Sequence, residues 1–107
     1  MPHYPFHERP DMLVFTCIHV LEEGAPVTTV CHHFDDNAWE FLCNCSHNDE
    51  DALVISISEL CGHDPSLALL CDLPVGGAAV RKSQAHAWEY GRIEGEKFYP
   101  AAESRMN

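Results

Sequence analysis

Cysteine and histidine residues gather in the first half of the chain, and their side chains could bind a metal ion. The segment from Cys31 to His47 holds three cysteines and three histidines in seventeen residues. Thiolate and imidazole groups are ligands that zinc prefers, and a structural zinc site arranges four of them in a tetrahedron. The residues that we expect to lie toward one end of a sheet, where they could share an ion, are Cys17, His19, Cys43, Cys45 and His47.

The spacing of these residues is a weak signal for zinc. Paired zinc-binding cysteines are usually separated by roughly two to four residues, whereas Cys43 and Cys45 are separated by one. Free cysteine also behaves as a small apolar residue that packs in protein cores. Thiols packed beside Val30 and the helical leucines explain the same pattern. We favour this interpretation, so that no cofactor is expected, with zinc as the alternative.

Other catalytic chemistry has little support in the sequence. There is no GxSxG, P-loop or HExxH motif. Cys61 and His63 could form a thiol nucleophile and its base, but they flank Gly62 at an expected helix end, where capping explains them. We therefore expect a protein that is not an enzyme. A small enzyme with a cleft between sheet and helices is the least favoured class.

Acidic residues dominate the charge of the chain. Seventeen Asp and Glu oppose six Lys and Arg, which gives a formal net charge of −11. Phosphate backbones would be repelled, so nucleic acid is not an expected partner. A basic protein is the expected partner, because complementary charge speeds the encounter of two proteins and sets their orientation. We expect the contacts in two acidic segments, with residues Asp35, Asp36, Asp49, Glu50 and Asp51.

Length and composition suggest one cytoplasmic domain. The chain has 107 residues, 46% of them hydrophobic, which suits a single modest core. There is no apolar run long enough to span a membrane, and the N-terminus has no apolar region typical of a secretory signal. Reduced thiols are then expected, and the location is expected to be the cytoplasm.

Apolar and β-branched runs predict the strands that must position these side chains. We expect strands over Met12–Leu21, Pro26–Phe34, Trp39–Cys43, Ala52–Ile57 and Ala78–Lys82. Helical residues are expected over Ser58–Cys61, ending at Gly62, and again from Asp64, with Pro65 in the first helical position. The predicted fold class is α+β: an antiparallel β-meander with two short helices packed on one face.

The ends of the chain are expected to lie outside this domain. Residues 1–11 contain three prolines and predict an extended N-terminal arm. Residues 12–90 form the single α+β domain, and residues 91–107 are expected to be a loosely ordered C-terminal tail. An edge strand such as the last one could pair with a second copy, so a homodimer is an open alternative.

Side chains alternate across strands, so the turns decide which residues meet. Four-residue turns would place Phe34 opposite Trp39, His32 opposite Phe41 and Val30 opposite Cys43. A hairpin between the first two strands would place Cys17 opposite Val30. The resulting core face carries Leu13, Phe15, Cys17, Val30, His32, Phe34, Trp39, Phe41 and Cys43, and the opposite face carries Thr16, Cys31, His33 and Glu40.

Two segments resemble a known family. FTCIHVLEEGAPVTTVCHHFDDNAWEFLC and DPSLALLCDLPVGGAAVR are similar to a family of small bacterial proteins, the domain of unknown function numbered twenty-one eighty-five, which is grouped with immunity proteins of bacterial toxin systems. The likeness covers roughly Phe15 to Arg81. It rests on folding features, namely the acidic turn before Trp39, the helix start at Asp64 and the chain reversal at Gly76. The family pattern has glycine and acidic residues near Asn44-Cys45-Ser46, so Cys45 is a departure that counts against an inherited zinc site.

The resemblance implies a fold more than an activity, and it transfers no catalytic residue. With the charge and the missing catalytic motifs, it supports a non-enzymatic, acidic protein-binding module that covers a basic partner such as a toxin. The alternative function is zinc binding by the cysteines and histidines at one end of the sheet.

Overall fold

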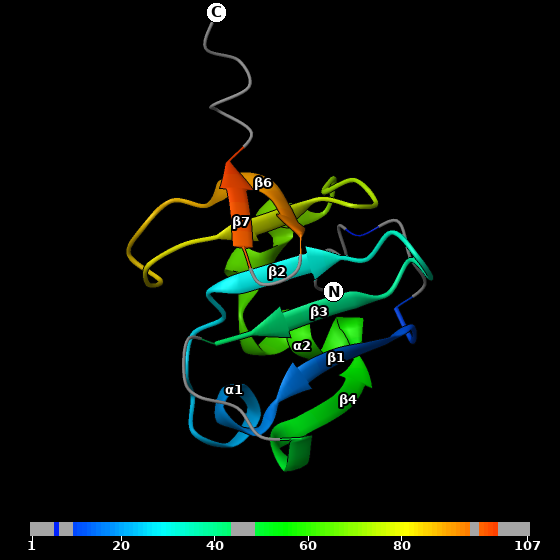
Figure 1. Ribbon diagram of the computed structural model, residues 1–107. Helices are drawn as coiled ribbons and strands as arrows, with labels where there is room; N and C mark the ends of the chain where they lie inside the picture. Colours follow the sequence, from blue (N-terminus) through cyan, green and yellow to red (C-terminus); the bar gives the residue numbers. More distant parts are fainter. Residues whose placement is uncertain (1–5, 7–9, 44–48, 95–96, 101–107) are drawn as a thin grey trace, which may run out of the picture.

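The computed structural model describes residues 6, 10–43, 49–94 and 97–100 (Figure 1). Within these residues seven strands form one sheet in the order β4-β1-β3-β2-β5-β6-β7. The strands are β1 (Leu13–Cys17), β2 (Thr29–His32), β3 (Trp39–Leu42), β4 (Ala52–Ser56), β5 (Ala78–Val80), β6 (Glu89–Glu94) and β7 (Lys97–Pro100). The helical segments are α1 (Ile18–Glu22), α2 (Ile57–His63) and two 3₁₀ helices, η1 (Asp49–Asp51) and η2 (Pro65–Leu70).

The prediction of a mixed fold with a mostly antiparallel sheet is confirmed, but the sheet is not a simple meander. β1 does not form a hairpin with β2. It lies between β3 and β4, antiparallel to β4 and parallel to β3. A parallel pair needs a crossover connection, and α1 with the following residues provides the start of it. The predicted pairing of Cys17 with Val30 is therefore wrong.

The strand predicted over Met12–Leu21 ends at Cys17, and α1 takes its second half. The β-branched residues of this run favour a strand, but packing outweighs this preference, because Val20 of α1 is buried in the core. Gly24 has φ of 72°, a left-handed conformation that glycine adopts readily, and the backbone N–H of Ala25 donates to the carbonyl of His19. These contacts end the helix and turn the chain toward β2.

The hairpin between β2 and β3 has a longer turn than expected. His32 pairs with Trp39 and Val30 with Phe41, a shift of two residues from the predicted register. The loop between them is closed by the N–H of His33 donating to the carbonyl of Ala38, with Asn37 at φ 62°. Because the shift is even, the faces of both strands are as predicted. Phe34 is the exception, since it falls in the loop and is 77% exposed rather than buried.

α2 and η2 cover one side of the sheet and lie behind it in Figure 1. Ser56 caps α2, and its hydroxyl accepts from the N–H of Glu59. α2 continues through Gly62, where the sequence predicted its end. The predicted start at Asp64 is confirmed, because its carboxylate accepts from the N–H of Ser66 and Pro65 follows it. The core between the helices and the sheet includes Val14, Val30, Trp39, Phe41, Leu60, Leu67 and Leu70.

A buried cation joins η2 to the end of β5. The guanidinium of Arg81 donates to the carboxylate of Asp64 at 3.2 Å, to the hydroxyl of Ser66 at 3.1 Å and to the carbonyl of Val27 at 2.9 Å. The same group lies 4.1 Å from the ring centroid of Trp88. Each of the three guanidinium nitrogen atoms thus donates a hydrogen bond inside the protein, which offsets the cost of burying the charge.

The sheet continues past Tyr90, where the sequence analysis placed the end of the domain. β6 pairs with β5 and β7 pairs with β6. Part of the predicted tail over 91–107 is therefore strand, and residues 101–107 lie outside the described residues. An added Cβ at Gly91 would collide with the carbonyl oxygen of Tyr99. A glycine at position 91 is thus required by the close approach of β7.

One residue of the predicted N-terminal arm packs into the core. Phe6 is buried, and its ring meets that of Trp39 edge-on with centroids 5.3 Å apart. Residues 1–5 and 7–9 lie outside the described residues. The boundary predicted at residue 12 therefore does not separate Phe6 from the core of the domain.

Candidate functional site

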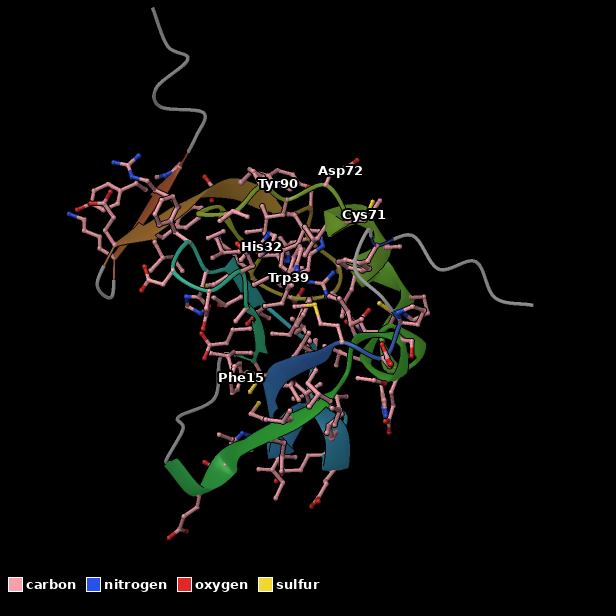
Figure 2. All side chains as sticks on the ribbon, turned by 90° about the vertical axis from the view of Figure 1, so that its right-hand side faces the viewer. Phe15, His32, Trp39, Cys71, Asp72 and Tyr90 are labelled. Atoms are coloured by element: carbon pink, nitrogen blue, oxygen red, sulfur yellow. The ribbon has the colours of Figure 1, made fainter. Side chains whose placement is uncertain are left out.

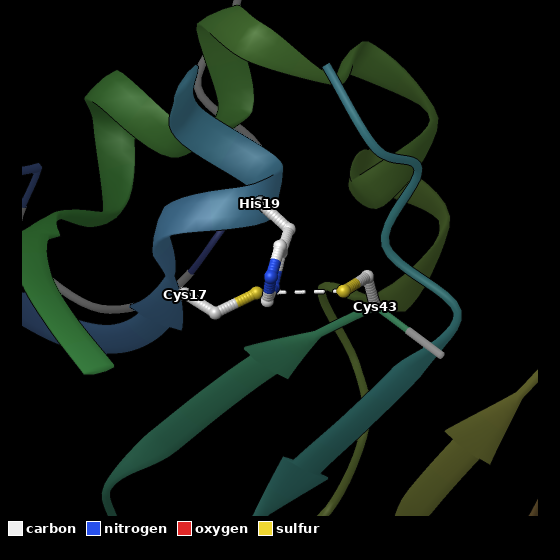
Figure 3. A group of neighbouring side chains, drawn as sticks. All are labelled: Cys17, His19 and Cys43. Carbon is white, nitrogen blue, oxygen red and sulfur yellow. Dashed lines mark hydrogen bonds between the residues drawn. The ribbon is translucent and has the colours of Figure 1, made fainter. Parts of the chain in front are cut away.

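The carboxyl ends of two neighbouring strands bring together three of the predicted ligands. β1 and β3 are parallel, so both end at the same edge of the sheet. Cys17 is the last residue of β1, His19 lies in the first turn of α1, and Cys43 directly follows β3. Figure 3 shows the imidazole of His19 pointing toward the two sulfur atoms. The ligand atoms of the three residues lie within 4.8 Å of one another.

The two thiols of this cluster are removed from water. Cys17 is 1% exposed and Cys43 is 4% exposed. Their sulfur atoms are 3.6 Å apart, within reach of a thiol–thiol hydrogen bond. Burial raises the pKa of the Cys17 thiol. Without a cation nearby, burial therefore favours the neutral form of the Cys17 thiol, because a buried thiolate would lack compensating charge.

Two predicted ligands are not placed by the structure. Cys45 and His47 lie outside the described residues, and their role as ligands stays a prediction. Among the described cysteines there is no disulfide bond; these residues are Cys17, Cys31, Cys43, Cys61 and Cys71.

The side of the sheet away from α2 and η2 carries exposed apolar side chains. Leu13 and Phe15 of β1 are 63% and 45% exposed, and Val54 of β4, which pairs with Phe15, is 50% exposed. Figure 2 places Phe15 on the opposite side of the sheet from Cys71, which follows η2. We call Leu13, Phe15 and Val54 the open face.

The open face corrects the predicted orientation of β1. Leu13 and Phe15 were expected in the core and Thr16 outside it, but Val14 and Thr16 are the buried residues. The orientation is reversed because β1 takes its register from β3 and β4 rather than from β2. Cys17 is nevertheless buried, since the chain leaves the strand there and turns into α1.

A hollow of about 350 Å³ adjoins the open face. It is lined by Phe15, His33, Asp35, Asp36, Ala38 and Glu40. Glu40 pairs with Phe15 across β1 and β3. Glu40 pairs with Cys31 across β2 and β3, and its Oε1 lies 3.1 Å from Nε2 of His33, which shares its face of the sheet as predicted. The hollow thus combines an aromatic ring with three carboxyl groups, a surface that suits a cationic side chain.

The two acidic segments predicted to bind a partner lie at opposite ends of the sheet. Asp35 and Asp36 precede β3, whereas η1, which contains Asp49, Glu50 and Asp51, precedes β4. β1 runs parallel to β3 and antiparallel to β4, so the starts of β3 and β4 are far apart. Only Asp35 and Asp36 adjoin the hollow.

A second hollow, which the sequence gave no sign of, lies where the β2–β3 loop meets β5 and β6. It measures about 270 Å³ and is lined by Cys31, His32, His33, Phe34, Gly76, Gly77, Ala78 and Ile93. Burial, and then the charge of Glu40, raise the pKa of Cys31 to about 11. His32 is bonded through Nδ1 to the carbonyl of Leu73 at 2.9 Å and stacks on Trp39. The thiol here is a poor nucleophile at neutral pH.

The thiol considered at the end of α2 is similar. Burial, and then the charge of Asp64, raise the pKa of Cys61 to about 11. A nucleophilic cysteine needs the opposite shift, since the thiolate is the reactive form. Neither Cys31 nor Cys61 therefore supports thiol catalysis.

No family model, curated protein or solved structure matches the chain. The resemblance to the bacterial domain family stays a prediction. Among the described residues, no helix has the length and apolar character needed to cross a membrane.

Proposed function

We propose that the chain is a non-enzymatic module that binds a basic protein through the open face and the hollow beside it. The observation that carries this proposal is the pairing of Phe15, Val54 and Glu40 on three adjacent strands, β1, β4 and β3, next to the exposed carboxyl groups of Asp35 and Asp36. It places apolar contact area and negative charge on one surface.

The apolar part of this surface would supply binding energy. Transfer of apolar surface from water contributes about 25 cal/mol per Å², and aromatic residues are frequent energetic centres of interfaces. The ring of Phe15 lies between Val54 on one side and Glu40 on the other. A partner that covers Phe15 would therefore bury an apolar centre bordered by a carboxylate.

The acidic part of this surface would determine which kind of partner binds. The hollow has room for an arginine or lysine side chain, which could contact the Phe15 ring and the carboxylates together. A second copy of the chain is disfavoured at this surface, because each copy carries a net charge of −11 and the same acidic residues. A basic protein complements the negative charge of this surface. The resemblance to toxin-blocking immunity proteins implies the same kind of partner.

We propose that this module acts in a reducing compartment, the cytoplasm, where cysteines are kept as thiols. There it would act stoichiometrically, by covering its partner.

Site-specific photo-crosslinking in the cells that make the protein tests the proposal. A photoreactive phenylalanine analogue replaces Phe15 in one variant and Leu69 in the other. Leu69 is a matched control, because it is also exposed but belongs to η2, behind the sheet. We expect position 15 to give one dominant adduct with a basic protein and position 69 to give none.

Purification of the crosslinked partner then allows the complex to be rebuilt. We expect direct binding that the variant Phe15→Ala weakens by about tenfold or more. Identical adducts at both positions, an adduct between two copies of the chain, or no adduct at position 15 would contradict the proposal.

A further inference from the structure

We propose that Cys17, His19 and Cys43 form a binding site for zinc at the carboxyl ends of β1 and β3. The site lies at the Cys17 end of β1, whereas the β2–β3 loop beside the hollow lies at the other end. It is therefore separate from the proposed binding surface, and the two proposals can fail independently.

The distance between the sulfur atoms fits a tetrahedral zinc ion. Two thiolates at about 2.3 Å from the ion, with a tetrahedral angle between them, lie about 3.8 Å apart. The Sγ atoms of Cys17 and Cys43 are 3.6 Å apart. A disulfide would instead need a separation of about 2.05 Å. Zinc thus requires a smaller movement of the two side chains than a disulfide does.

The histidine can also reach the ion. A sulfur and an imidazole nitrogen bound to the same zinc at a tetrahedral angle lie about 3.5 Å apart, given Zn–S and Zn–N distances of about 2.3 and 2.0 Å. The ligand atoms of the three residues all lie within 4.8 Å. A shift of about 1 Å in the His19 side chain, which is only half-buried, would bring a ring nitrogen into bonding distance as the third ligand, and a water molecule would take the fourth position.

The backbone holds these three residues in place before the metal arrives. Cys17 belongs to the β1–β4 ladder, where it pairs with Ala52. Cys43 follows the last residue of β3, and the carbonyl of that residue, Leu42, accepts from the N–H of Thr28 at 2.8 Å. Because the strands fix both cysteines, little conformational freedom is lost when the ion binds.

The donor set selects the type of metal. Two thiolates and an imidazole favour zinc and related soft or borderline ions over calcium and magnesium, which prefer oxygen ligands. On binding, each thiol loses its proton to solvent, so the ion gains two S–Zn bonds and two protons are released. The two negative sulfur atoms then balance the charge of Zn²⁺ in an otherwise buried site.

Metal titration of the full chain, made without a histidine tag and kept reduced, tests the site. We expect about one Co²⁺ per chain, with the thiolate-to-cobalt charge-transfer band and the strong visible bands of a tetrahedral complex. Zinc should displace the cobalt and raise the midpoint of thermal unfolding by about 5 °C or more.

Variants locate the ligands. Cys17→Ala and Cys43→Ala should lose the charge-transfer band and the zinc-dependent rise in midpoint. Cys31→Ala is the matched control, because this half-buried thiol lies on β2, outside the cluster, and should leave both signals unchanged. The readout is the difference made by zinc within each variant, so a lower starting stability does not obscure it.

His19→Ala provides a second test if either cysteine variant fails to fold. We expect the dissociation constant for zinc to rise by about 100-fold or more. Absence of cobalt binding by the unaltered chain, unchanged binding by the Cys17, Cys43 or His19 variants, or equal loss in Cys31→Ala would overturn the proposal.

Discussion

The side chain of Arg81 forms a buried hydrogen-bond network with Asp64, Ser66 and the backbone of Val27. Its guanidinium and the carboxylate of Asp64 are both almost fully buried, and together they join β5 to η2. Removing one member of such a pair leaves the other charged and without its partner in the interior. This loss is much more costly than the pair is stabilising.

We predict that Arg81→Met lowers the free energy of unfolding by about 3–5 kcal/mol. Urea unfolding monitored by tryptophan fluorescence measures the change, and Trp88, which packs on Arg81, is a natural reporter. Arg92→Met is the matched control, because Arg92 pairs with Glu94 on the surface. A similar loss of stability in both variants would show that the buried network has no special role.

At the residue scale, the sequence predicted which residues form the cysteine–histidine cluster better than it predicted how the strands bring them together. Cys17, His19 and Cys43 were expected near one another, and the structure brings them together. The strand pairing that brings them together differs from the predicted one, because β1 pairs in parallel with β3 and not with β2. Parallel pairing joins residues far apart in sequence, and no local pattern reveals it. The acidic hollow could not be predicted from the sequence either, because it depends on the outward orientation of Phe15.

At the scale of elements, β1 shows why an alternating pattern can mislead. The strand LVFTC has apolar residues on both faces, so periodicity alone cannot tell which face is buried. The pairing of β1 with β3 and β4 determines which face is buried, and it places Val14 and Thr16 in the interior. The β2–β3 hairpin was more predictable. There the polar turn and the alternation from Val30 to Phe41 fix the faces, even though the register shifted by two residues.

A pair of alanine substitutions tests the orientation of β1. We predict that Val14→Ala lowers the free energy of unfolding by about 2 kcal/mol, because it leaves a cavity in the core. Leu13→Ala removes a larger side chain, but this side chain is exposed, and we expect a change of about 0.5 kcal/mol or less. Chemical denaturation measures both, and the reverse order would support the orientation expected from the sequence.

At the scale of the whole molecule, the acidic hollow and the cysteine–histidine cluster lie at opposite ends of the sheet. The acidic hollow lies beside the β2–β3 loop, whereas α1 and η1 lie at the end where Cys17 pairs with Ala52. The net charge of −11 was plain from the sequence. Which acidic residues gather beside an apolar surface was not, because that depends on the sheet order.

We predict that Asp35→Lys combined with Asp36→Lys slows association with the crosslinked partner by about tenfold or more at low salt, and by less at high salt. Stopped-flow mixing over a series of salt concentrations measures the rates. Glu22→Lys combined with Glu23→Lys is the control, because it changes the net charge equally at the exposed end of α1. Equal slowing by both would mean that overall charge, and not the hollow, guides the partner.

The order of strands has a consequence for synthesis on the ribosome. β1 is the first strand to be made, but its two neighbours in the sheet, β3 and β4, are made only after β2. A nascent chain that has released β1 therefore has nothing to pair with its backbone, and Leu13, Val14 and Phe15 all face water. β1 can gain its first neighbour only when residues 39–42 have emerged, and its second only when residues 52–56 have emerged. A pause in translation before residues 39–42 would leave this apolar strand with neither neighbour.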